Sequence, residues 1–207
     1  MPPKVKFTKD EIVRAAVEVV RKKGTAGLTA REVAAELGVS TRPIFTYYES
    51  MEELRRDVYE AAKEIHRCRI EAGLSEKIPF LGVGKQYLAF AREDPELYRL
   101  LYLTKPDGVT GGAAESLRMS QDMVRESLMN IYGIDAQTAD CYYRDLWLVV
   151  FGFAAMIVSG GCPFTNEQMS SVLTEVSVSV FKAYKEIPGL SRGEFDRDAV
   201  FRELTGK

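Results

Sequence analysis

The sequence is poor in the residues on which disulfide frameworks and many active sites depend. Its 207 residues include one histidine, one tryptophan and three cysteines. Three cysteines (Cys68, Cys141 and Cys162) are too few for a disulfide framework and would leave one unpaired. This favours a reducing compartment, and therefore a cytoplasmic location. No apolar run follows the N-terminal lysines, so no signal peptide is expected.

Catalytic and metal-binding motifs are also absent from the sequence. It contains no GxSxG, no glycine-rich phosphate loop and no HExxH, and the single histidine has no evident nucleophile beside it. His66 and Cys68 are two residues apart, which places them on different faces of a helix. There is no second Cys/His cluster with ligand spacing. We therefore expect no catalytic residues, no cofactor and no metal site.

One long segment carries no charge and raises the question of a membrane span. The 21 residues between Asp145 and Glu167 are all uncharged. Their continuous apolar part, Leu146 to Val158, is 13 residues long, whereas a span needs about 20. The segment therefore predicts a buried helix, with no membrane partner.

Charge is distributed unevenly along the chain. Residues 1–50 contain nine Lys/Arg and six Asp/Glu, whereas the rest contains 19 basic and 24 acidic residues. A basic N-terminal segment followed by an acidic remainder is typical of a chain whose N-terminal segment binds a polyanion.

Helix start signals recur throughout the sequence. The pattern Ser/Thr-x-x-Glu/Gln begins at Thr8, Thr29, Ser50, Thr165 and Ser191, and Asp94-Pro95 and Asp135 are further starts. Glycines 24, 38, 73 and 133 mark stops. Apolar residues between these marks have helical spacing and no hairpin signal is present. We predict an all-α fold with helices at 8–23, 29–37, 41–48, 51–72, 79–93, 95–103, 113–132, 136–160, 165–186 and 192–204.

The first three helices are short, and the chain changes character after residue 50. Later segments are longer, more acidic and richer in Tyr, Phe and Met. We therefore predict two domains, 1–50 and 51–207. The small N-terminal domain should pack against the helix that begins at Met51, because about fifty residues bury little core alone.

Residues 29–48, TAREVAAELGVSTRPIFTYY, have the pattern of a helix-turn-helix. Gly38 provides the left-handed position of the tight turn, and Ser40 or Thr41 caps the next helix. That helix turns polar side chains and Arg42 outward, which suits the major groove of DNA. An ordinary helical hairpin with solvated polar residues would have the same spacing. Thr29 and Arg31 at the preceding helix start are placed to meet phosphate.

The stretch from Ile12 to Leu54 resembles the DNA-binding domain of the TetR/AcrR family of bacterial transcriptional regulators. Matching groups are Ile12-x-x-Ala15-Ala16, Gly24, Leu28-Thr29, Val33-Ala34-x-x-Leu37-Gly38-Val39-Ser40, Ile44-Phe45-x-x-Tyr48 and Ser50-Met51-Glu52-Glu53-Leu54. The segments around Gly84 to Ala91 and Pro95 to Tyr102 resemble a C-terminal subgroup of that family. The resemblance implies a three-helix DNA-binding domain, a helical ligand-binding and dimerisation domain, a homodimer and usually repression.

The resemblance and the spacing together give the candidate DNA-binding residues. They are Thr29, Arg31, Ser40, Thr41, Arg42, Pro43, Phe45, Thr46 and Tyr47. Two positions depart from the family, which commonly has Tyr at Phe45 and Lys at Met51, both contacting phosphate. The loss of the lysine charge should flatten the salt dependence of binding by about 0.9 log–log units. Lys4, Lys6 and Lys9 are candidates to compensate.

Aromatic and thioether side chains of the body suit an adaptable apolar cavity. The candidate ligand-pocket residues are His66, Tyr87, Phe90, Tyr102, Met123, Tyr143, Trp147 and Phe151. For each residue taken singly, a simple core position is the favoured interpretation. The cavity itself is implied by the family.

The last two long helices mix small and β-branched residues, which permits close packing of four helices around a two-fold axis. Packing inside one subunit would explain the same composition. The candidate dimer-interface residues are Phe153, Met156, Ile157, Gly160, Val172, Val176 and Ser179.

The leading hypothesis is a homodimeric regulator, a repressor, that binds a palindromic double-stranded operator and is released by a small apolar or aromatic effector. One alternative is a protein-binding adaptor whose N-terminal domain has lost specific DNA binding. The other is an all-α enzyme.

Overall fold

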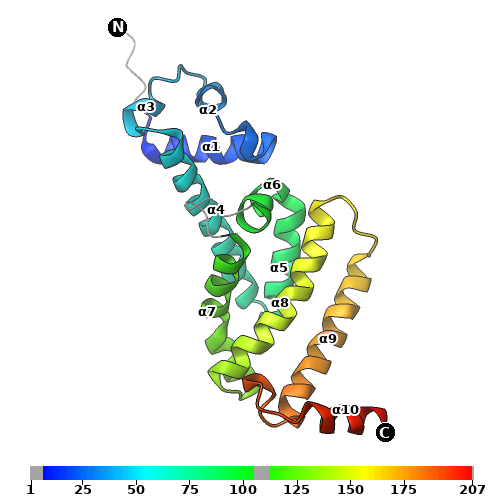
Figure 1. Cartoon of the computed structure of the whole chain (residues 1–207). Helices are drawn as coiled ribbons and strands as arrows, with labels where there is room; N and C mark the ends of the chain where they lie inside the picture. Colours follow the sequence, from blue (N-terminus) through cyan, green and yellow to red (C-terminus); the bar gives the residue numbers. More distant parts are fainter. Residues whose placement is uncertain (1–6, 105–111, 207) are drawn as a thin grey trace.

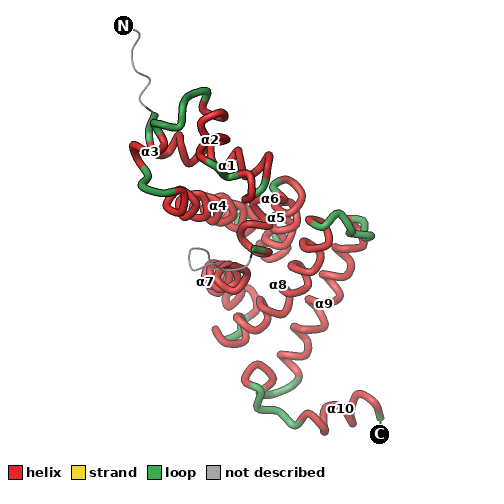
Figure 2. Tube along the Cα trace, turned by 45° about the horizontal axis from the view of Figure 1, so that its top comes forward, coloured by secondary structure: helices red, strands yellow, loops and turns green. Residues whose placement is uncertain are grey.

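The computed structural model describes residues 7–104 and 112–206 and contains only helices, turns and loops in those ranges. Figures 1 and 2 show a small N-terminal head of three helices joined by one long helix to a larger helical body. The all-α prediction is confirmed, and so is its division into a helix-turn-helix head and a helical C-terminal part.

The helices follow the predicted order closely. The head contains α1 (Lys9–Lys23), α2 (Ala30–Leu37) and α3 (Ile44–Tyr47), and α4 (Met51–Leu74) leads from it into the body. The body contains α5 (Pro79–Glu93), α6 (Pro95–Tyr98), α7 (Gly112–Tyr132), α8 (Ala136–Val158), α9 (Asn166–Glu186) and α10 (Arg197–Thr205). Short helical turns lie at Thr25–Gly27 (η1), Arg99–Leu103 (η2) and Leu190–Arg192 (η3).

Side-chain caps explain why most helices begin where the sequence indicates. Thr8 and Thr165 form complete capping boxes with Glu11 and Gln168. The predicted caps Thr29, Ser50 and Asp135 each accept a hydrogen bond from a backbone N–H three residues ahead. These contacts are local, so the sequence alone specifies them.

Three predicted helices differ in the structure. The helix predicted at 41–48 has α-helical geometry only over Ile44–Tyr47, and no side chain of Ser40 or Thr41 caps it. The segment 95–103 divides into α6 and η2, the latter with the wider π-helical geometry. The last helix begins at Arg197 with Asp196 as its cap, so the capping box predicted at Ser191 is wrong.

The long helix α4 belongs to two packing units. It packs against α1 of the head and against α5 and α7 of the body. The predicted boundary at residue 50 separates the short helices from the longer ones, but α4 packs against helices on both sides of it. The division into domains 1–50 and 51–207 therefore stays a prediction.

Helices α4 and α5 approach each other closely where two glycines face one another. A Cβ atom added to Gly82 would lie 2.2 Å from the carbonyl oxygen of Gly73, and one added to Gly73 would lie 2.6 Å from the amide nitrogen of Val83. Gly73, predicted to stop a helix, thus lies inside α4 and allows the two backbones to touch.

The central helix of the body is α8, which packs against α5, α7 and α9. By length and composition alone α8 could cross a membrane, the one described helix for which this holds, and 44% of its most apolar window is buried. The buried part includes Tyr142, Trp147 and Phe153 in the body's core. The uncharged segment, for which the sequence analysis predicted a buried helix, is thus only partly buried, and Leu148 within it is exposed.

Candidate nucleic-acid interface and effector cavity

The candidate DNA-binding residues of the head share one property, which is exposure. Of the nine, Pro43 is half-buried and the other eight are exposed to solvent. The exposed residues are Thr29, Arg31, Ser40, Thr41, Arg42, Phe45, Thr46 and Tyr47. Behind them Ile44 and Tyr48 are buried against the head's core. The helix-turn-helix therefore presents its polar side and Phe45 outward and keeps its apolar side in.

A glycine and a tyrosine hold this geometry. Gly38 adopts the left-handed conformation at the end of α2, with φ of 70°, as the turn requires. The Tyr48 hydroxyl donates to Asp57 of α4 over 2.8 Å. Burial, then the hydrogen bond to this carboxylate, raises the pKa of Tyr48 far above its usual range, so the hydroxyl stays protonated and keeps donating.

Two hydroxyls of the exposed face already have partners. Thr46 donates to the carbonyl of Arg42 over 3.0 Å, and Tyr47 donates to the carbonyl of Phe7 over 2.7 Å. This hydrogen bond of Tyr47 connects the segment before α1 to α3. Both hydroxyl oxygens keep lone pairs that can accept from base amino groups.

Some basic side chains of the head form ion pairs, whereas the two candidate DNA-binding arginines form none with any described residue. Lys22 pairs with Glu36 at 2.6 Å, Lys23 with Glu32 at 2.5 Å and Lys9 with Asp57 at 2.7 Å. Within the described part of the chain, Arg31 and Arg42 form no ion pair, so both are available to phosphates or base edges. Lys9 is engaged with Asp57, and Lys4 and Lys6 lie outside the described residues.

Apolar side chains stand at the two positions where the family commonly has a phosphate-contacting tyrosine and lysine. The two side chains differ in exposure. Phe45 is 51% exposed on the outer face of α3. Met51 is half-buried and packs against the core. Neither supplies the hydroxyl or charge that would reach a phosphate from those positions.

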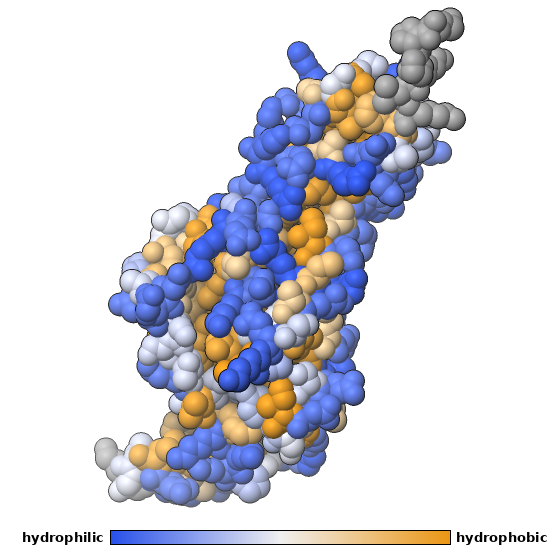
Figure 3. Space-filling model, turned by 180° about the vertical axis from the view of Figure 1, so that it is seen from behind, coloured by the Kyte–Doolittle hydropathy of each residue, from blue (hydrophilic) through white to orange (hydrophobic). Residues whose placement is uncertain are grey.

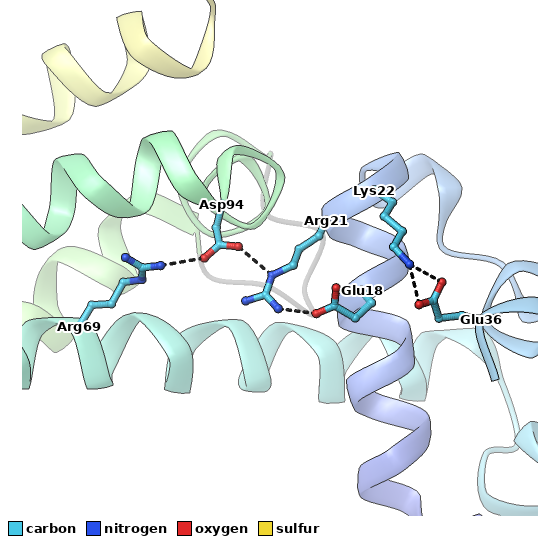
Figure 4. Close-up of polar contacts among 6 residues, drawn as sticks. All are labelled: Glu18, Arg21, Lys22, Glu36, Arg69 and Asp94. Carbon is cyan, nitrogen blue, oxygen red and sulfur yellow. Dashed lines mark hydrogen bonds and ion pairs between the residues drawn. The ribbon is translucent and has the colours of Figure 1, made fainter.

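A buried carboxylate joins the head to the body (Figure 4). Asp94, between α5 and α6, accepts from Arg21 Nε of α1 at 2.7 Å and from Arg69 Nη2 of α4 at 3.0 Å. Its side chain is 9% exposed. Arg21 also pairs with Glu18, and Arg69 with Glu93 at 2.9 Å.

This junction explains a difference from the sequence-based prediction. The sequence predicts Asp94 as the cap of the helix that begins at Pro95, but its side chain makes no capping hydrogen bond. The carboxylate binds two guanidinium groups instead of the backbone N–H groups of α6, and charge assistance favours that choice.

An apolar cavity of about 310 Å³ lies in the body between α5, α8 and α9. Its lining residues include none with a charged side chain. They are Ile78, Phe80, Leu81, Val83, Gly84, Tyr87, Tyr132, Tyr143, Leu146, Trp147, Val150, Leu173, Thr174 and Ser177.

Three candidate pocket residues, Tyr87, Tyr143 and Trp147, line this cavity. His66, Phe90 and Tyr102 lie behind it in a buried aromatic cluster, in which rings of Tyr87 and Tyr102 are 5.1 Å apart. Phe151 stacks on Trp147 with ring centroids 5.0 Å apart, and Met123 is half-buried on α7. The sequence could not distinguish residues that line the cavity from residues that pack behind it, because both groups are aromatic and have the same helical spacing.

His66 is fully buried, and the Tyr102 hydroxyl lies 3.0 Å from Nε2 and 3.1 Å from Nδ1 of its ring. Burial, with a smaller effect of the Arg69 charge, lowers the pKa of His66 to about 3, so the imidazole is neutral at physiological pH. Among residues 7–104 and 112–206 no group of three His, Cys, Asp or Glu side chains could hold a metal ion.

The candidate dimer residues lie on α8, on α9 and just beyond α8, with different exposures. Phe153 is 5% exposed and stacks edge-on against Phe164, so it belongs to the chain's own core. Met156, Ile157, Val172 and Val176 are half-buried, and Gly160 and Ser179 are exposed.

Two apolar residues that the sequence analysis did not single out, Leu148 on α8 and Val178 on α9, are 55% and 62% exposed. The C-terminal helix α10 also carries apolar surface, because Phe201 and Leu204 are exposed. Figure 3 shows apolar surface at the lower left, at the end of the molecule where the chain ends.

Comparison with known protein families identifies the chain. Residues 12–58 match the model of bacterial regulatory proteins of the tetR family, and residues 80–179 match the tetracyclin repressor-like C-terminal domain. The chain belongs to the TetR family of transcriptional regulators. The resemblance seen in the head of the sequence is thus confirmed, and it extends through the body.

Solved structures of other proteins share the fold at low sequence identity. A protein of unknown function from Rhodococcus sp. RHA1 is 18% identical with a TM-score of 0.68, over 88% of this chain and 98% of that one. A TetR-like regulator from the same organism is 15% identical with a TM-score of 0.60, over 86% and 96%. A TetR variant from Acinetobacter baumannii AYE in complex with minocycline is 16% identical with a TM-score of 0.55, over 87% and 97%. No curated protein matches the sequence.

Proposed function

We propose that this TetR-family regulator is a cytoplasmic homodimeric repressor, which binds a palindromic operator and releases it when a small apolar or aromatic molecule enters the cavity of the body. The exposed helix-turn-helix face carries the proposal, because it presents Arg31, Arg42 and five hydroxyl side chains in front of the buried Ile44. Arginine pairs with guanine through two hydrogen bonds, and threonine reaches base edges or a thymine methyl.

Dimerisation is supported by the exposed surface of the last two long helices of the body. A two-fold pair of heads would read two half-sites about one helical turn apart, which makes the operator a palindrome. Leu148 and Val178 leave apolar surface on α8 and α9 that a second copy could cover.

A chain of contacts supports coupling between the cavity and the head. Tyr87 lines the cavity and packs against Tyr98 with ring centroids 5.7 Å apart. Phe90, on the same helix as Tyr87, packs under the guanidinium of Arg69 at 5.4 Å. Arg69 and Arg21 then share Asp94 (Figure 4). A ligand that reshapes the cavity can therefore change the spacing of the heads.

The mechanism we propose is a shift between two populations of the dimer. The effector binds more tightly to the conformation whose heads are wrongly spaced for the operator. It can weaken operator binding only by the ratio of its affinities for the two conformations.

Operator selection from a random duplex library, with the purified protein at stated salt, tests DNA recognition. We expect enrichment of a palindrome, and a well-folded dimer that enriches none would favour the adaptor function that Phe45 and Met51 suggest.

Variants of the head then test the interface. Arg42→Ala should weaken binding to the selected operator by about 1–3 kcal/mol and relax specificity at one base pair. Arg118→Ala on α7 removes an equal charge from an exposed site in the body, so it should leave affinity unchanged. Equal losses in the two variants would mean that only overall charge matters.

A further inference from the structure

The cavity of the body contains a polar group that its surroundings do not satisfy. Trp147 lines the cavity, and its indole Nε1 is buried without a hydrogen-bond partner, the only such side-chain atom among the described residues. A buried donor without an acceptor destabilises the protein unless something else accepts from it. Phe151 stacks on the indole with ring centroids 5.0 Å apart, and the N–H, which lies in the indole plane, does not point at the Phe151 ring.

Three hydroxyl groups of the cavity lining already have partners. Ser177 lies 2.6 Å from the Tyr142 hydroxyl, and Thr174 donates to the carbonyl of Ser170 over 2.9 Å. The Tyr87 hydroxyl lies 3.5 Å from that of Tyr98. Each hydroxyl pair keeps one O–H that can donate, whereas the indole N–H of Trp147 has no partner among the described residues and gains most from a ligand acceptor. Because Nε1 itself is buried, the indole ring must turn toward the cavity to meet that acceptor.

Charge further restricts what the cavity accepts. Its lining has no Lys, Arg, Asp, Glu or His side chain. A ligand carboxylate or ammonium group would lose its hydration there and gain no opposite charge, which is costly in an apolar site.

We propose that the cavity binds an uncharged, largely apolar ligand that presents one carbonyl-type acceptor to the indole N–H of Trp147. This inference rests on the proposed function, because it names the chemical class of the effector at that same cavity. A fused bicyclic ring system with a ketone or lactone oxygen has the required features. Carboxylates of the same size lack them.

Three probes of nearly equal shape test the class. Acetylnaphthalene is neutral with an acceptor, ethylnaphthalene is neutral without one, and naphthoate is an anion. Calorimetric titration of the full-length protein gives each Kd, and the emission of Trp147, the one tryptophan of the chain, reports binding near it. We expect acetylnaphthalene to bind about tenfold more tightly than ethylnaphthalene, and naphthoate more weakly than either.

Trp147→Phe is the matched variant, because phenylalanine keeps an aromatic ring in the cavity wall and removes the N–H. We expect it to bind ethylnaphthalene with a similar Kd, which shows that the cavity is intact, and to lose the preference for acetylnaphthalene. A preference that survives in Trp147→Phe, an equal affinity for the two neutral probes in the unmodified protein, tightest binding of naphthoate, or no binding of any probe would each overturn the inference.

Operator affinity, measured with and without acetylnaphthalene, separates this inference from the proposed function. Trp147-dependent binding that leaves operator affinity unchanged supports the ligand class and contradicts release of DNA through the cavity. Release of the operator by all neutral probes alike, with no effect of Trp147→Phe, contradicts the ligand class and supports the proposed function.

Discussion

The carboxylate of Asp94 should stabilise the contact between head and body, and Asp94→Asn tests this. The carboxylate is 9% exposed and accepts charge-assisted hydrogen bonds from Arg21 and Arg69. Such bonds contribute about 1.5–3 kcal/mol each when buried. The two arginine side chains are 34% and 22% exposed and each keeps another carboxylate, so solvent screening reduces both contributions. We expect a total loss of about 1–3 kcal/mol in the free energy of unfolding.

Urea unfolding measures this loss, and a double-mutant cycle with Arg21→Gln isolates the contact across the junction. The matched control is Glu18→Gln, because Glu18 pairs with the same arginine but within α1. That pair is exposed and should contribute less than about 0.5 kcal/mol. The reasoning is refuted if Glu18→Gln costs as much as Asp94→Asn, or if the cycle gives no interaction energy between Arg21 and Asp94.

Two further predictions concern the core of the body. Because the pKa of His66 is about 3 in the folded protein and about 6.5 in an unfolded chain, only the unfolded state gains a proton between these values. Stability should therefore fall as pH decreases below about 6.5, by up to about 1.4 kcal/mol per pH unit. His66→Gln should remove that part of the slope in urea unfolding at several pH values, and equal slopes would contradict the buried neutral imidazole. Gly82→Ala should destabilise the protein by about 1–3 kcal/mol, since its methyl group would meet the Gly73 carbonyl. Gly84→Ala, which meets nothing within 4 Å, should stabilise α5 by about 0.5–1 kcal/mol, and thermal unfolding that ranks the two variants otherwise would show that α4 and α5 do not meet there.

Helix positions in this protein could largely be predicted from sequence because their signals are local. Thr8 and Thr165 cap helices through residues three positions away, and Gly38 sets the turn by its own backbone conformation. Where a distant partner competes, the local signal misleads. Asp94 binds arginines of α1 and α4 rather than capping α6. The stop predicted at Gly73 lies one residue before the observed end of α4 at Leu74.

The candidate DNA-binding face could also be proposed from sequence, because helical spacing decides which side chains of a short helix turn outward. Spacing does not show what those side chains bind. The hydrogen bond from Tyr47 to Phe7 and the ion pair of Lys9 with Asp57 join residues about 40 or more positions apart.

For the cavity, the sequence shows only that the helices of the body are rich in aromatic residues. Which of them line the space depends on the packing of the helices: Tyr87, Tyr143 and Trp147 line it, while Phe90 and Tyr102 pack behind it. The same packing leaves the indole N–H of Trp147 without an acceptor. A cap or a turn depends on neighbours in the chain, whereas a cavity depends on how α5, α8 and α9 pack, and that packing is set by contacts between residues far apart in the sequence.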